Sequence, residues 1–251
     1  MTRTAITLFA LCLTVGCGTQ YADPIAERPA SAACSSVVAQ FDGASYGTAA
    51  RLIQDDFTIE AWIRTSSSPK GSSFAEGSAL VFADVEGVQV YDFSTGIVND
   101  KLVISVGRPD TAATSTSDVT SDHWQHVAVS RKRDNGVQLL FVDGALEGSA
   151  VGNTHALDQS PSITIAGRAA RNFYTGLMAD VRLWATVRTQ AQILANMHRR
   201  LSGNEEGLVG YYRLDDGSAA SSARDSSPRD NGAVFTGSVT WPVSDVPLCG
   251  P

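Results

Sequence analysis

The sequence predicts an all-β protein, built as a two-sheet antiparallel jelly-roll β-sandwich with one short helix. Its apolar and β-branched runs are short, and Gly, Asp, Asn and Ser separate them. Several runs alternate apolar and polar residues, which is the period of a half-buried strand. Apolar residues recur at helical spacing in residues 189–203 alone. Many short strands with turn residues between them are typical of a sandwich or jelly roll.

Residues 1–16 have the features of a signal peptide. Arg3 gives a positive start, and residues 5–15 form a mostly apolar run that is too short to span a bilayer. The stretch from Thr14 to Cys17 resembles the lipobox of bacterial lipoproteins, although a leucine is usual where Thr14 stands. This resemblance implies cleavage before Cys17 and a lipid on its sulfur. The alternative is ordinary secretion without Cys17, and in both cases we expect the chain to be exported.

Residues 17–33 are small, polar and proline-containing, which predicts a flexible tether. Residues 34–251 contain no second linker long enough to divide them, and about 215 residues are normal for a single β-sandwich. Two polar stretches, 64–79 and 107–122, are expected to be loops inside this domain.

The charge balance argues against nucleic acid as a partner. The chain has 19 basic and 26 acidic residues, a net charge of −7 at pH 7. Residues 1–16 hold one basic and no acidic residue, so the remainder carries −8. Phosphate binding needs clustered Lys and Arg. The one cluster, Arg131-Lys132-Arg133, lies beside a predicted turn and is expected to be a solvated loop.

The clearest strand is predicted at residues 56–65, where residue types alternate. One face would carry Phe57, Ile59, Ala61 and Ile63, and the other Thr58, Glu60, Trp62 and Arg64. Further short strands are predicted within 36–42, 79–85, 88–93, 101–107, 162–168, 174–185 and 207–214.

Residues 123–148 predict two consecutive hairpins. The runs 124–131 and 137–142 alternate, and Asn135-Gly136 between them allows the positive φ of a tight turn. Asp143-Gly144 starts the second hairpin. His123 and His126 are three residues apart, so on a strand their rings point to opposite faces and cannot share a metal. We therefore interpret this segment as sheet and not as a catalytic or metal site.

The single helical stretch is predicted to begin after Thr189, which can cap it, and to end at Gly203. Ile193, Met197 and Leu201 recur every four residues and would form its apolar face.

Two of the four cysteines belong to the predicted domain. Cys12 lies in the signal segment and Cys17 at its end, which leaves Cys34 and Cys249 near the two ends of the domain. Two cysteines in an exported protein suggest one disulfide. The alternative is a pair of free thiols, which oxidising compartments disfavour. Their spacing does not suggest zinc.

The order of the segments carries a family resemblance. They are VVAQFDGASYG, DFTIEAWIRT, HWQHVAVSRKRDNGVQLLFVDGALEG, SITIAGR, YTGLMADVRLWATVRTQAQILANM, GLVGYYRLDDGS and ARDSSPRDNGAV. This order resembles the laminin-G-like and pentraxin-like group of the concanavalin A-like lectin/glucanase superfamily, over residues 36–240. The resemblance implies two packed antiparallel sheets, with the helix at 189–200 across one edge. It also implies neighbouring terminal strands, which fits a Cys34–Cys249 bridge.

The sequence lacks the catalytic patterns of the sugar-cleaving members of this superfamily. Those enzymes carry a strand with Glu-x-Asp-x-x-Glu, and the acids of residues 84–92 do not fit it. The stretch GASYG at 43–47 has the form of a nucleophile elbow with Ser45 as nucleophile. That elbow needs a helix directly after it, and the predicted helix is far away. We therefore predict no catalytic residue and no enzyme activity.

The resemblance also implies a bound Ca²⁺, with Asp42 and Asp180 at the matching positions. Ca²⁺ takes six to eight oxygens, so two carboxylates with carbonyls and water could make a weak extracellular site. The alternatives are that Asp42 only ends a strand and starts a turn, and that Asp180 pairs with Arg182 on the same strand face.

These observations predict a non-catalytic binding domain, secreted or lipid-anchored in the bacterial cell envelope, that recognises a glycan or a surface protein. The alternative is a structural or adhesive part of a surface assembly without a soluble ligand; a hydrolase is less favoured. The sequence assigns no sugar site. Aromatic candidates near predicted loops are Tyr46, Tyr91, Phe173 and Tyr174, whereas Trp62, Trp124 and Trp184 are expected to be buried.

Overall fold

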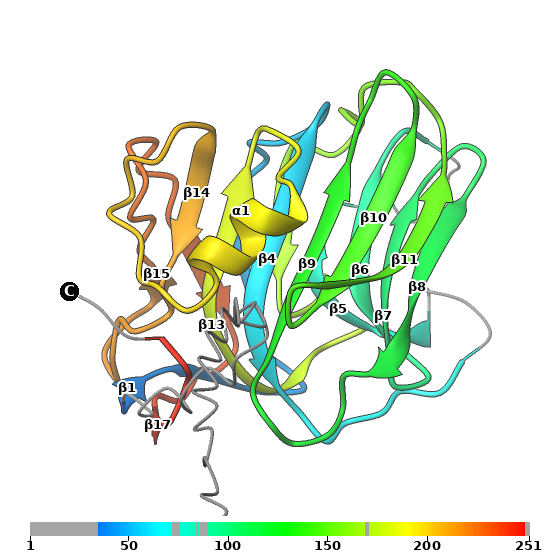
Figure 1. The fold of residues 1–251 in the computed structure, drawn as a ribbon. Helices are drawn as coiled ribbons and strands as arrows, with labels where there is room; N and C mark the ends of the chain where they lie inside the picture. Colours follow the sequence, from blue (N-terminus) through cyan, green and yellow to red (C-terminus); the bar gives the residue numbers. More distant parts are fainter. Residues whose placement is uncertain (1–34, 72–75, 84, 86–89, 169–170, 249–251) are drawn as a thin grey trace, which may run out of the picture. The chain divides into compact units, whose positions relative to one another are not determined.

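The computed structural model describes residues 35–71, 76–83, 85, 90–168 and 171–248. Across these residues the strands form two large antiparallel sheets and a two-stranded ribbon (Figure 1). The ribbon pairs β1 (Ser36–Val37) with β17 (Val243–Ser244). The predicted all-β sandwich and the predicted meeting of the terminal strands are therefore confirmed.

The seven-stranded sheet is built around β13, the longest strand. Its order is β11 (Ala145–Val151), β10 (Val137–Val142), β9 (Gln125–Arg131), β4 (Phe57–Arg64), β13 (Thr175–Trp184) and β14 (Leu208–Tyr212), and β2 (Ala39–Asp42) also pairs with β13.

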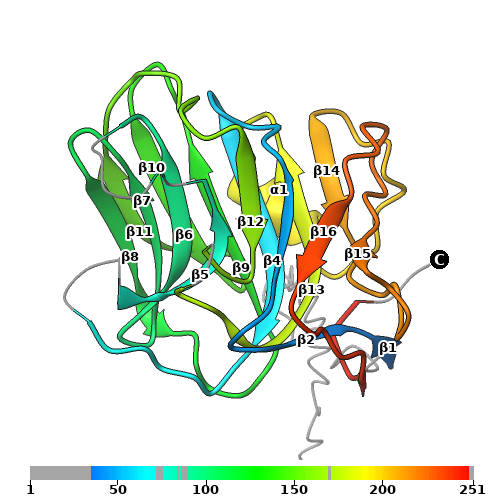
Figure 2. The same ribbon diagram turned by 180° about the vertical axis from the view of Figure 1, so that it is seen from behind.

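The eight-stranded sheet lies in front of the other in Figure 2. Its order is β15 (Ser222–Ala223), β16 (Ala233–Thr236), β3 (Tyr46–Ala50), β12 (Ser162–Ile165), β5 (Ser78–Phe82), β6 (Phe93–Val98), β7 (Lys101–Val106) and β8 (Thr111–Asp118). The expected loop at 107–122 is wrong, because it contains β8. Ala113 and Ser115 are buried there between exposed neighbours, a period-two pattern that Ser and Thr concealed.

The inner faces of the two sheets form the main core, as the alternation in β4 predicts. Phe57, Ile59, Ala61 and Ile63 all lie in this core. The opposite face of β4 is also buried, which the alternation alone does not predict: Thr58 and Glu60 are fully buried and Trp62 is 2% exposed. A further layer therefore covers the outer face of the seven-stranded sheet.

That layer is α1 (Gln190–Asn196), the one helix in the described residues (Figure 1). Thr189 caps it as predicted, in a reciprocal capping box with Gln192. The helix ends at Asn196 and not at Gly203, whose φ of +94° lies in the following loop. Ile193 packs on the sheet face and not across its edge. No helix in the described part of the chain is long and apolar enough to cross a membrane.

Both predicted hairpins are confirmed. Gly136 turns β9 into β10 with a φ of +69°, and Asp143 and Gly144 turn β10 into β11 with φ values of +48° and +76°. Positive φ at both central residues suits the right-handed twist of adjoining strands.

Candidate functional site

Asp42 lies at the exposed end of β2 and starts a turn. Its Oδ1 accepts hydrogen bonds from the backbone N–H of Ala44 and the hydroxyl of Ser45, both at 2.9 Å. The bond from Ala44, and then that from Ser45, hold the pKa of Asp42 below its usual range. Ser45 itself is fully buried and is followed by β3, so the stretch at 43–47 lacks the strand-to-helix geometry of a nucleophile elbow.

Asp180 lies inside β13, at an irregularity of the pairing with β4. It is 1% exposed and has a φ of +58°. The hydroxyl of Tyr211 donates to its Oδ1 at 2.6 Å, and Arg182 forms an ion pair with its Oδ2. Asp180 is thus held by side chains of the protein itself. One of them is Arg182, the partner that the sequence analysis gave as the alternative to Ca²⁺.

The structure does not bring Asp42 and Asp180 together. Asp42 pairs with Thr175, five residues before Asp180 on β13. At about 3.3 Å per residue this is a separation of about 16 Å along the strand. No cluster of three or more His, Cys, Asp or Glu that could hold a metal occurs in the described residues. Ca²⁺ binding stays a prediction. Asp42 and Asp180 are too far apart to hold the same ion, so a site would need other ligands.

A buried ionic cluster lies between β4, β9, β13 and the segment that begins α1. Glu60 is its centre: Oε1 is 3.0 Å from Arg188 Nη1, and Oε2 is 3.4 Å from Arg182 Nη1 and 3.5 Å from His126 Nε2. Burial raises the pKa of Glu60, but His126 and the two arginines outweigh it and hold that pKa below its usual range. All four side chains are at most 5% exposed.

This ionic cluster holds the helix. Arg188 donates to the carbonyl of Gln192 at 2.8 Å and Arg182 to that of Asn196 at 3.2 Å. The indole of Trp62 donates to the carbonyl of Met197 at 2.7 Å. The last carbonyls of a helix lack intrahelical partners, and Arg182 and Trp62 donate to the carbonyls of Asn196 and Met197 at this end of α1. Together with the bond from Arg188 to Gln192, these donors anchor α1 to the sheet. We therefore interpret the cluster as architecture and not as a ligand site.

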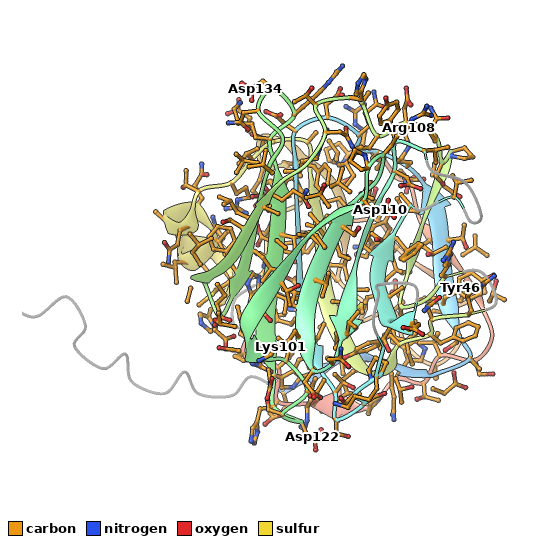
Figure 3. All side chains as sticks on the ribbon, turned by 90° about the vertical axis from the view of Figure 1, so that its right-hand side faces the viewer. Tyr46, Lys101, Arg108, Asp110, Asp122 and Asp134 are labelled. Atoms are coloured by element: carbon orange, nitrogen blue, oxygen red, sulfur yellow. The ribbon has the colours of Figure 1, made fainter. Side chains whose placement is uncertain are left out.

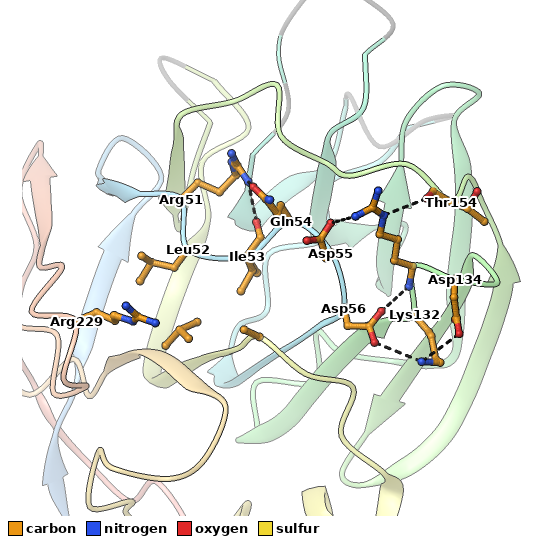
Figure 4. A pocket seen from close by; sticks show the side chains of 13 residues that line it. Arg51, Leu52, Ile53, Gln54, Asp55, Asp56, Lys132, Asp134, Thr154 and Arg229 are labelled. Carbon is orange, nitrogen blue, oxygen red and sulfur yellow. Dashed lines mark hydrogen bonds and ion pairs between the residues drawn. The ribbon is translucent and has the colours of Figure 1, made fainter.

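A groove of about 910 Å³ lies at one end of the sandwich (Figure 4). Asp134, which lines it, lies at the same end as Arg108, whereas Lys101 and Asp122 lie at the other end (Figure 3). Its lining comes from the segment before β4, the β9–β10 turn, three further loops and β14. The residues are Arg51, Leu52, Ile53, Gln54, Asp55, Asp56, Lys132, Arg133, Asp134, Thr154, Ala185, Val209 and Arg229.

Arg131 fixes the loops that form this groove. Its guanidinium donates to the carbonyls of Asp55 at 2.9 Å, Asn153 at 2.9 Å and His155 at 2.7 Å. The side chain is fully buried, so the expected solvated loop is wrong at this position. The sequence did not reveal that Arg131 is buried, because the next two residues of the basic run, Lys132 and Arg133, do line the groove. The loop conformation is thus set before any ligand arrives.

Most charges in the groove are paired within the protein. Arg133 Nη1 lies 2.8 Å from Asp55 Oδ1, and its backbone N–H donates to Asp56 at 2.7 Å. Lys132 lies 3.4 Å from both Asp56 and Asp134. Figure 4 shows these pairs on one side of the groove and Leu52 and Arg229 on the other.

The four aromatic candidates have different positions. Tyr174 is fully buried and its hydroxyl donates to the carbonyl of Leu177 at 2.9 Å, so it belongs to the core. Tyr46 and Phe173 form a partly exposed pair with ring centroids 6.0 Å apart. Tyr91 stacks on the exposed ring of His155 at 4.2 Å, directly after Thr154 of the groove.

Among the predicted tryptophans, Trp62 and Trp184 are buried at 2% and 3% exposure, and Trp124 is partly buried. His126 is buried whereas His123 is exposed. Cys17, Cys34 and Cys249 lie outside the described residues, so lipidation and the disulfide stay predictions.

A smaller cavity of about 510 Å³ lies at the opposite end and includes Asp42. Arg64, which lines it, pairs with Asp122 at 3.3 Å and Asp245 at 3.5 Å.

Comparison with known proteins assigns the fold to a family. Residues 40–194 match the laminin-G family described as the concanavalin A-like lectin/glucanases superfamily. The chain belongs to this family. No curated protein matches the chain.

Solved structures share the fold at low sequence identity. A candidate carbohydrate-binding protein from Bacteroides ovatus has a TM-score of 0.66 and 20% identity, with 86% of this chain and 62% of that protein covered. The chain therefore spans less than two thirds of that protein. The heptameric SAP-like pentraxin from Limulus polyphemus has a TM-score of 0.52 and 14% identity, over 83% of this chain and 95% of that one.

Proposed function

We propose that this protein is a non-catalytic carbohydrate-binding domain and that the groove at the Arg131 end holds the saccharide. The observation that carries the proposal is the groove itself. Its volume of about 910 Å³ is in the usual range for small-molecule sites. Its walls combine hydrogen-bonding side chains with the apolar surfaces of Leu52 and Val209, and Arg131 holds two of its loops in place.

Two further observations support this function. The family contains lectins, and the protein from Bacteroides ovatus with the same fold is described as a candidate for carbohydrate binding. The stacked pair of Tyr91 and His155, with Arg108 5.5 Å from the tyrosine ring centre, lies beside Thr154. Flat rings next to a polar groove offer a surface on which the C–H face of a sugar can pack.

We further propose that the domain is exported and is anchored through a lipid on Cys17. The support is the apolar run of residues 5–15 directly before TVGCG. The Cys17→Ser variant should move from the membrane fraction to the soluble fraction. A wild-type protein already found outside the membrane fraction would contradict the anchor. Non-reducing peptide mapping tests the proposed Cys34–Cys249 bridge, which the pairing of β1 with β17 favours.

A glycan array tests the binding function. Thr154→Trp fills the groove with a large side chain, and Thr236→Trp makes the same change at an exposed position of β16, outside both cavities. We expect the wild type and Thr236→Trp to bind the same glycans and Thr154→Trp to lose at least about tenfold in affinity, or about 1.4 kcal/mol. No glycan bound, or equal losses in the two variants, contradicts the proposal.

The array is run once with CaCl₂ and once with EDTA. Binding that disappears in EDTA supports Ca²⁺ as the cofactor of this domain. Equal binding in both removes Ca²⁺ from the proposed function and leaves the groove as its site.

A further inference from the structure

Arg229 presents an exposed guanidinium that forms no hydrogen bond or ion pair with the described residues. It lines the groove from the segment between β15 and β16. In Figure 4 its side chain extends from this segment toward the other lining residues. An exposed arginine without a partner is common on a protein surface, so its meaning depends on what surrounds it.

The backbone around Arg229 is fixed. The carboxylate of Asp225 is 4% exposed and accepts from the N–H groups of Tyr211 at 2.8 Å, Ser227 at 2.8 Å and Asn231 at 3.0 Å. The N–H of Arg229 itself donates to the hydroxyl of Ser227 at 3.3 Å. The segment is therefore tied to β14, and little backbone ordering remains for a ligand to induce.

Arg51 places a second positive charge on the groove that no carboxylate of the described residues pairs with. Its guanidinium donates to the side-chain oxygen of Gln54 at 2.6 Å and to the carbonyls of Ile53 and Asp158, both at 3.4 Å. These partners are neutral oxygens, so they orient the guanidinium and leave its charge uncompensated.

The acidic residues of the groove do not cancel these two charges. Asp55 pairs with Arg133, and Asp56 and Asp134 pair with Lys132, on the other side of the groove. The groove thus has one side where acidic and basic side chains pair with each other, while the positive charges of Arg51 and Arg229 are left without a carboxylate partner. Leu52 and Val209 belong to the same lining and supply apolar surface.

We propose that the groove binds an acidic saccharide whose carboxylate or sulfate group is held by Arg229, with Arg51 adding to the local positive potential. This inference rests on the proposed carbohydrate-binding function and names its ligand class. A guanidinium presents a planar fork of donors that matches a carboxylate or sulfate in two parallel hydrogen bonds. The chain as a whole has a net charge of −7 and repels anions, so selective binding of an anion requires a local site such as this one.

Affinity electrophoresis with matched polysaccharides tests the ligand class. Polygalacturonate is compared with its methyl ester, and chondroitin sulfate with desulfated chondroitin whose uronates are methyl-esterified. Within each pair the sugar backbone is the same and only the charge differs. We expect retardation by at least one charged member and none by its uncharged partner. Desulfated chondroitin with free uronates separates the two acidic groups: retardation by it shows that a carboxylate is recognised, and retardation by chondroitin sulfate alone shows that a sulfate is required.

Three variants test whether Arg229 makes the contact. Arg229→Gln removes the guanidinium, and we expect it to lose at least about tenfold in affinity for the retarding polysaccharide. Arg224→Gln makes the same charge change at an exposed position outside the groove and should bind within about twofold of the wild type. Arg229→Lys keeps the charge without the fork and should fall between them.

The outcomes separate this inference from the proposed function. Equal binding of charged and uncharged members overturns the acidic ligand, and equal losses in Arg229→Gln and Arg224→Gln overturn Arg229 as its contact, while carbohydrate binding stands in both cases. No retardation by any polysaccharide, together with an empty glycan array, overturns both.

Discussion

The protein uses arginine in two opposite ways. Arg182 and Arg188 lie under α1, are at most 5% exposed and share the carboxylate of Glu60. Arg51 and Arg229 line the groove, reach solvent, and have no carboxylate partner among the described residues. Arginine side chains thus anchor a helix in one region and present uncompensated positive charge in the other.

Burial explains the difference. A charge taken out of water must be paired and hydrogen-bonded, or the fold is strongly destabilised. Arg182 and Arg188 therefore have partners because the fold requires them, and these partners say little about ligands. Arg51 and Arg229 are hydrated, so the fold does not require a carboxylate beside them. Unpaired charge on a fixed loop is for this reason better evidence of function than a dense cluster of buried charges.

The largest effect is expected at Glu60. Glu60→Gln leaves Arg182 and Arg188 buried without their shared carboxylate, so we expect the free energy of unfolding at pH 7 to fall by about 3–5 kcal/mol. Urea denaturation followed by tryptophan fluorescence measures it. Glu147→Gln is the control: its partly exposed carboxylate accepts from Ser117 at 2.6 Å, and its loss should cost about 1 kcal/mol. Equal effects would mean that the ionic cluster does not anchor α1.

The pH dependence sharpens this prediction. The pKa of Glu60 is lower in the folded protein than in the unfolded chain. Its contribution to stability is therefore fully present above the unfolded value of about 4.3 and is lost as pH falls through the lower folded value. The difference between wild type and Glu60→Gln should be constant near neutral pH and shrink below about pH 4. A difference that grows in acid would contradict the assigned direction.

A smaller effect, on stability and binding together, is expected at Arg131. Arg131→Met keeps an unbranched stem but leaves the carbonyls of Asp55, Asn153 and His155 without their donor. We expect a loss of about 1–3 kcal/mol in unfolding free energy. Glycan binding should also weaken at temperatures where the variant is still folded. Unchanged binding in the folded variant would show that the loops of the groove do not depend on Arg131.

Arg133 tests the groove with little effect on the fold. The Arg133–Asp55 pair is 46% and 44% exposed, so its loss in Arg133→Gln should cost less than about 1 kcal/mol. The freed carboxylate of Asp55 then adds negative charge to the groove. We expect weaker binding of the acidic polysaccharide, restored by the double variant Arg133→Gln/Asp55→Asn. Unfolding curves and affinity electrophoresis on the same samples separate the two effects.

The fold could be predicted from the sequence because its signals are local. Alternation in β4, positive-φ residues at Gly136 and Gly144, and the capping box at Thr189 each specify an element within a few residues. The groove could not be predicted in the same way. Arg51 and Arg229 are 178 residues apart in the sequence and line the same groove only because β3 and β16 are neighbours in the sheet, and no local pattern marks either residue as a ligand contact.

The smallest effect is expected at Asp42, which contrasts with Asp180 as the groove arginines contrast with the buried ones. Asp42 is exposed and accepts from Ala44 and Ser45 through one oxygen, a role that the amide oxygen of Asn can also fill. We expect Asp42→Asn to change the unfolding free energy by less than about 0.5 kcal/mol at pH 7. Asp180→Asn removes one of the two buried carboxylate partners of Arg182 and should cost several times more. Thermal melts of both variants measure this ratio. Similar losses would show that exposure does not separate these two carboxylates.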